Sequence, residues 1–104
     1  MEWGRISEYR HLIKYEQILN THDEKLQELI QLLDFFEENG EQFKALMSYY
    51  TSEQRDQDLE KENQGLIPER IHRGVLSEDA IYNLYADYRE QALRMLEIGT
   101  TFFK

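Results

Sequence analysis

Cysteine is missing from this sequence of 104 residues, which excludes a disulfide framework, thiolate metal ligands and a cysteine nucleophile. Proline occurs once, and no apolar run approaches the ~20 residues that a membrane span needs. The opening residues lead into no apolar segment, so we expect neither a signal peptide nor a membrane partner. A chain without cysteine suits the reducing cytoplasm, which is where we expect this protein.

Positive charge is also scarce, because 12 lysines and arginines stand against 21 acidic residues and give a net charge of −9. Phosphate backbones repel a chain of this balance, so nucleic acid is not an expected partner. Hydrophobic residues make up 40% of the sequence, which is typical of a folded domain and not of a disordered chain. The length corresponds to a single domain spanning residues 1–104.

A seven-residue repeat organises the first half of the sequence and predicts long amphipathic helices. One heptad position holds Tyr15, His22, Leu29, Phe36, Phe43 and Tyr50, and a second holds Leu12, Leu19, Leu26, Leu33 and Met47.

The repeat predicts a first helix over about residues 4–38, continuous through 20–23 even though a capping signal there would also suit a break. Asn39-Gly40 should end it, since both residues tolerate the left-handed conformation. A second helix is expected over about residues 41–62, with an interruption near residue 51 as the alternative.

The most complete helix start lies in the second half of the sequence. Ser77 is suited to be the N-cap, and Leu76 and Ile81 have the spacing of a hydrophobic staple. We therefore predict a last helix over about residues 78–98. Upstream, Pro68 should open a short helical piece over 69–73, which Gly74 closes.

Together these elements predict an all-α fold. The expected architecture is an antiparallel helical bundle of three main helices, with a long first helix and a short helical piece in the connection.

The runs Tyr49-Tyr50, Ile67-Pro68 and above all Arg73 to Tyr82 resemble a family of small bacterial proteins known as domain of unknown function 4298. The resemblance covers roughly residues 15–97. Arg55 and His72 depart from it, because the family often has tryptophan and lysine at those positions. The resemblance implies a small helical fold and no established activity.

Two Glu-x-x-His pairs, Glu8 with His11 and Glu69 with His72, match the spacing found in di-iron helical bundles. A sequence so rich in glutamate also produces such pairs by chance. We therefore predict no metal site and no cofactor, and keep a metal-binding helical bundle as an alternative hypothesis.

Arg70 and Arg73 form the one local basic cluster, together with His72, just before the start of the last helix. These side chains are suited to hold an anion or a partner protein. Alternatively, they pair with acidic residues of the chain itself, for which Asp56, Asp58 and Glu60 are the candidates.

The leading functional hypothesis is a non-catalytic protein–protein interaction module and not an enzyme. A first helix roughly 50 Å long exceeds what shorter neighbours can cover, so self-association is expected. A second alternative is an acidic decoy that occupies a nucleic-acid-binding protein.

Overall fold

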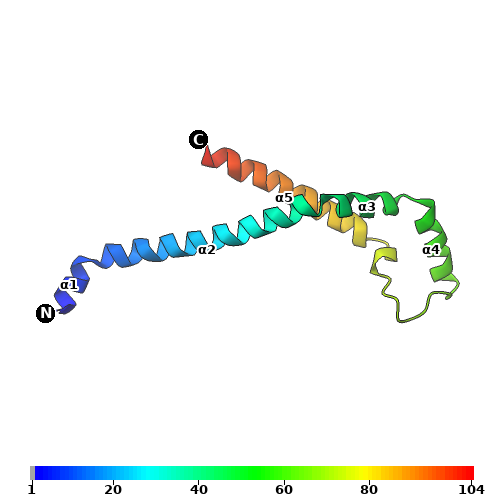
Figure 1. Ribbon diagram of the computed structural model, residues 1–104, viewed down its shortest axis with the longest axis horizontal. Helices are drawn as coiled ribbons and strands as arrows, with labels where there is room; N and C mark the ends of the chain where they lie inside the picture. The colour runs from blue at the N-terminus through cyan, green and yellow to red at the C-terminus, as the bar shows by residue number, and fades with distance from the viewer. Residues whose placement is uncertain (1) are drawn as a thin grey trace. The chain divides into compact units, whose positions relative to one another are not determined.

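A computed structural model describes residues 2–104, and side chains from residue 5 onward (Figure 1). The all-α fold class is confirmed, since the described residues contain helices and no strand. The chain divides into two compact units, Met1–Glu41 and Gln42–Lys104, and each is described separately below.

The first unit contains α1 (Glu2–Glu8) and α2 (Arg10–Glu38). Tyr9 separates the two helices, and its N–H donates to the carbonyl of Ile6 at 3.1 Å, which closes a tight turn. The predicted helix over 4–38 is therefore divided at Tyr9 but runs without a break through 20–23. At the other end, both the backbone N–H and the side-chain amide of Asn39 donate to the carbonyl of Phe35 at 2.9 Å.

No residue of α2 is buried, although its sequence carries the apolar heptad repeat. The seven apolar residues at the two heptad positions expose between 42% and 61% of their surface: Leu12, Tyr15, Leu19, Leu26, Leu29, Leu33 and Phe36. The packed interior expected of a three-helix bundle is therefore not seen along this helix, since none of its residues is buried.

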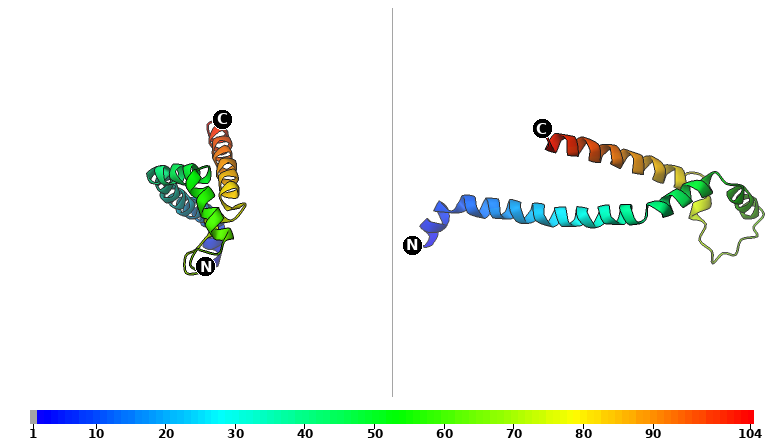
Figure 2. Two further views of the ribbon diagram at one scale, coloured as in Figure 1. Left: turned by 90° about the vertical axis from the view of Figure 1, so that its right-hand side faces the viewer. Right: turned by 45° about the horizontal axis from the view of Figure 1, so that its top comes forward.

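The second unit comprises α3 (Gly40–Tyr50) from Gln42 onward, α4 (Glu53–Asn63), the 3₁₀ helix η1 (Gly74–Leu76) and α5 (Ala80–Phe102). The chain turns sharply between α3 and α4 at Thr51-Ser52, as Figure 2 shows. Ser52 makes this corner, because its Oγ accepts from the N–H of Arg55 at 3.2 Å and donates to the carbonyl of Tyr49 at 2.7 Å. The predicted second helix is thus interrupted, which was the alternative considered for residue 51.

Packing in this unit centres on Ile81, the only buried residue among those whose side chains the structure describes, with 3% of its surface exposed. About two turns further along α5, the ring of Tyr88 stacks on the ring of Phe43 from α3, with centroids 4.3 Å apart. Aromatic rings of this size fill the space between two helix axes, so α3 and the first half of α5 share one small core.

The connection from α4 to α5 is not helical over residues 69–73, where the sequence predicted a short piece. Gly65, just after the end of α4, has a φ of +68°. The carbonyl of Pro68 accepts a hydrogen bond from the N–H of Ile71 at 3.0 Å, which forms a turn. The Nη1 of Arg73 donates to the carbonyls of Pro68 and Ile71 at 3.2 and 3.0 Å. Only the turn at Pro68 has a backbone hydrogen bond within this segment, and the helical turn forms at η1 instead.

Ser77 lies three residues before α5, and its Oγ accepts from the N–H of Ala80 at 3.3 Å. The helix begins at Ala80 with Asp79 at the N-cap position, so the prediction of Ser77 as the N-cap of a helix starting at residue 78 is wrong. The helix then continues past Gly99, where the sequence predicted its end, and closes at Phe103, whose N–H donates to the carbonyl of Gly99 at 3.3 Å. Thr100 and Thr101 support this last turn by donating their hydroxyls to the carbonyls four residues before them.

Candidate functional site

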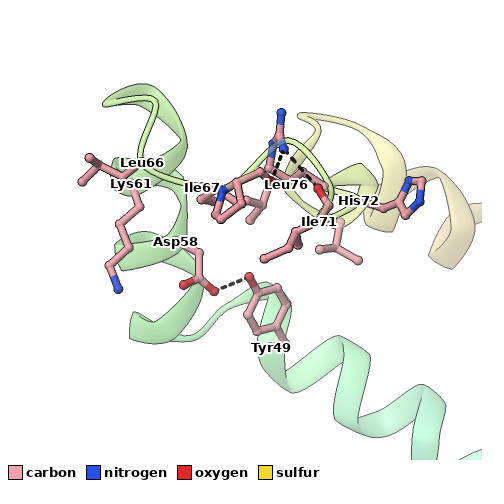
Figure 3. A pocket seen from close by; sticks show the side chains of 11 residues that line it. Tyr49, Asp58, Lys61, Leu66, Ile67, Ile71, His72 and Leu76 are labelled. Carbon is pink, nitrogen blue, oxygen red and sulfur yellow. Dashed lines mark hydrogen bonds between the residues drawn. The ribbon is translucent and has the colours of Figure 1, made fainter.

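A pocket of about 380 Å³ lies in the second unit, between α4 and the connection to α5 (Figure 3). We call it the connection pocket. Its floor is aliphatic, with Ile67, Ile71 and Leu76 gathered together, and its polar edge carries Tyr49 and Asp58. The imidazole of His72 lies on the opposite side from Asp58 (Figure 3).

The polar edge of the pocket is a hydrogen-bonded group of three side chains. The hydroxyl of Tyr49 donates to Oδ2 of Asp58 at 2.7 Å, and Nε2 of Gln54 donates to Oδ1 at 3.1 Å. Partial removal from water and the hydrogen bond to Asp58 raise the pKa of Tyr49. The hydrogen bonds from Tyr49 and Gln54 lower the pKa of Asp58. The tyrosine therefore remains a proton donor and is not activated as a base.

Arg73 is anchored within the unit. Its guanidinium forms an ion pair with Glu62, and both side chains are about one-third exposed. Together with the two carbonyls of the connection, this pair occupies the guanidinium. The acidic partner is Glu62 and none of the three acidic residues that the sequence nominated. Arg70 is exposed at the surface of the same connection.

Arg55 links α4 to the segment before α5. Its guanidinium carbon lies 4.8 Å from the centroid of the Tyr50 ring, and Nη2 donates to the carbonyl of Ser77 at 3.4 Å. Such a cation over an aromatic face is attracted by the ring quadrupole. Arg55 thus helps to hold the start of α5 beside the corner of α3 and α4.

The residues of the two Glu-x-x-His pairs lie in different kinds of structure. Glu8 ends α1 and His11 lies in the first turn of α2, whereas Glu69 and His72 lie in the connection. Within the residues that the structure describes, no three His, Asp or Glu side chains form a group that could hold a metal ion.

The remaining residues singled out in the sequence lie in the lining of the connection pocket, in η1 or in α5. Pro68 and Leu76 line the connection pocket, Gly74 begins η1, and Ile81 is the buried residue of α5. A second hollow of about 350 Å³ adjoins Ile81, and its lining is almost entirely apolar. Its exposed rim is formed by Tyr82 and Tyr85.

The largest chemical feature of the first unit is the exposed repeat of α2. We call the eight residues of its two heptad positions the α2 stripe: Leu12, Tyr15, Leu19, His22, Leu26, Leu29, Leu33 and Phe36. Ile18, Ile30 and Leu32 flank the stripe and are also exposed. An apolar face of this length can bury a complementary helix.

Sequence reasoning did not identify the contact between Tyr49 and Asp58. The two residues are nine positions apart, and only the corner at Thr51-Ser52 brings them together. The capping signal at Ser52 indicated that corner, but no motif connects a tyrosine and an aspartate across it.

Residues 12–98 match the family described as "Domain of unknown function (DUF4298)". No curated protein and no solved structure matches the chain. Among the described residues, no helix has the length and apolar character required to cross a membrane.

Proposed function

Because the chain belongs to the DUF4298 family, whose description names no activity, we propose from its structure that it is a non-catalytic protein–protein interaction module. The observation that carries this proposal is the exposed α2 stripe. It runs along nearly the whole of a 29-residue helix, from Leu12 to Phe36.

The size of the stripe suits a stable protein interface. Burying a large aliphatic side chain stabilises a complex by roughly 1.5–3 kcal/mol, which corresponds to about 60–120 Å² of apolar surface each. The seven apolar residues of the stripe therefore offer roughly 400–850 Å², and Ile18, Ile30 and Leu32 extend it. Stable complexes bury about 800 Å² per partner.

The second unit supplies the fixed part of the module. The stacked rings of Phe43 and Tyr88, the buried Ile81 and the anchored Arg73 order α3, α4 and the start of α5 without any partner. In this proposal, the antiparallel bundle predicted from the sequence is completed only when a partner helix covers the α2 stripe.

A pair of matched variants tests the proposal. Leu26→Glu places a charge in the middle of the stripe, whereas Gln31→Glu places the same charge on the opposite face of α2. Glutamate and leucine have similar helix propensities, so neither variant should melt the helix by itself.

The mass of the full chain should be measured by light scattering on the purified protein, and by size-exclusion chromatography with antibody detection in extract from cells that express it. The wild type and Gln31→Glu should have masses above the 12.6 kDa of one chain, and Leu26→Glu should return to that mass. If the wild type stays at 12.6 kDa in both preparations, the α2 stripe binds no partner and the proposal is wrong.

A further inference from the structure

We propose that the partner covering the α2 stripe is the α2 stripe of a second copy, paired antiparallel. This inference rests on the proposed interaction function and names the partner for it. Its grounds are the sizes of the side chains along the stripe, the distribution of charge along α2, and the area that two such stripes bury.

The sizes of the stripe residues favour the antiparallel direction. One heptad position holds only leucine: Leu12, Leu19, Leu26 and Leu33. The other holds larger or polar side chains at three of four places: Tyr15, His22, Leu29 and Phe36.

Antiparallel pairing of two such helices places one heptad position against the other in each layer. With the two-fold axis at Glu24, Leu12 then faces Phe36 of the partner subunit and Leu33 faces Tyr15 of the partner subunit. Large and small side chains alternate across the interface, which allows close packing. In a parallel pair each residue would face its own copy, so that two His22 rings and two Phe36 rings would meet.

Charge along α2 favours the same direction. Residues 24–38 contain five acidic side chains and a single lysine, whereas residues 10–23 contain two acidic and two basic side chains. A parallel pair would place the two acidic halves side by side. An antiparallel pair places each acidic half beside the nearly neutral half of its partner, which lowers the repulsion between the chains.

The helix macrodipoles also favour the antiparallel direction, since the positive end of each helix lies beside the negative end of the other.

The test uses spin labels on single cysteines, for which the cysteine-free chain provides a clean background. Glu24→Cys, Gln31→Cys and Glu38→Cys share one heptad position on the outer face of α2 and avoid the stripe. Distances between labels on two copies are then measured by pulsed electron paramagnetic resonance in the full chain.

In the antiparallel pair, the offsets along the helix axis should be about 0, 21 and 42 Å for the three positions, at 1.5 Å per residue. The measured distances should therefore increase in this order. Three equal distances would mean a parallel pair and would overturn the antiparallel assignment. Adding Leu26→Glu to the Glu24→Cys variant should abolish the dipolar coupling, and Gln27→Glu is the matched control.

Absence of dipolar coupling at all three positions in the purified chain would overturn pairing between copies. The interaction function itself would still stand if the chain in cell extract remained above the mass of one chain and Leu26→Glu reduced it. The two failures are thus distinguishable.

Discussion

Tyr49 and Asp58 hold the corner between α3 and α4 by a hydrogen bond whose two partners have opposite pKa shifts. The pKa of Tyr49 is raised and that of Asp58 is lowered, so the bond joins a neutral hydroxyl to a carboxylate throughout the neutral range. Its contribution to stability is lost above the raised pKa of Tyr49 as pH increases. It is also lost as pH falls through the lowered pKa of Asp58.

A difference titration tests this pairing. Tyrosinate absorbance is followed in the wild type and in Tyr49→Phe, and the difference between the curves reports Tyr49 alone. Its midpoint should lie above the ordinary value of about 10, because the folded state favours the neutral hydroxyl. Asp58→Asn should move the midpoint back toward that value. A midpoint for Tyr49 at or below that of the other tyrosines would contradict the observed contact.

Gly65 and Gly99 provide a matched test of how backbone conformation affects stability. Gly65 has a φ of +68°, and Gly99 lies inside α5, while a Cβ added at either position meets no atom within 4 Å. Gly65→Ala should lower the free energy of unfolding by about 1 kcal/mol, because alanine strains the left-handed conformation. Gly99→Ala should raise it by about 0.5–1 kcal/mol through helix propensity. Urea unfolding followed by circular dichroism measures both, and equal effects of the two variants would refute this assignment.

At the scale of elements, helix ends were predictable where a local signal exists. Asn39-Gly40 ends α2 as predicted, although Asn39 has a φ of −110° and not the expected left-handed conformation. The start of α5 was placed two residues too early, because the cap position belongs to Asp79 and not to Ser77. The end of α5 was placed too early, because Gly99 has a negative φ and the two threonines after it sustain another turn. The non-helical conformation of residues 69–73 depends on the hydrogen bonds from Arg73 to the carbonyls of Pro68 and Ile71. Helix propensities of single residues do not include such a contact.

The surface that covers the α2 stripe and the residues that form the connection pocket could not be predicted from the sequence. The heptad repeat indicates that the α2 stripe is suited to burial, but a repeat does not say which surface covers it. The connection pocket was not predicted at all, since its residues come from α3, α4 and the connection and meet only after the corner at Ser52 has formed.

Ser52 allows a test at this scale, because one side chain both caps α4 and ties it to the end of α3. Ser52→Ala removes the hydrogen bonds to the N–H of Arg55 and the carbonyl of Tyr49, and should cost about 1 kcal/mol of stability. Ser52→Asp retains an acceptor for the cap and should recover part of that loss. Thermal unfolding compares the variants, and an unchanged midpoint for Ser52→Ala would show that the corner forms without its cap.

At the scale of the whole molecule, the net charge of −9 opposes contact between copies. Salt screens this repulsion while leaving the burial of apolar side chains in place. Sedimentation at increasing sodium chloride concentration, from about 0.05 to 0.5 M, should therefore show a growing fraction of dimer. A decoy for a basic protein would show the reverse, because its binding to that protein would weaken with salt. A dimer fraction that falls with salt would contradict a mainly apolar interface.

The exposed stripe of α2 also has a consequence for the life of a newly made copy. A helix that keeps its apolar residues in water has little to hold it against opening, and opened segments are what proteases cleave. Copies without a counterpart should thus be degraded first. If copies pair as proposed, turnover would remove synthesis in excess, and the amount of the protein in the cell would follow how much of it is paired.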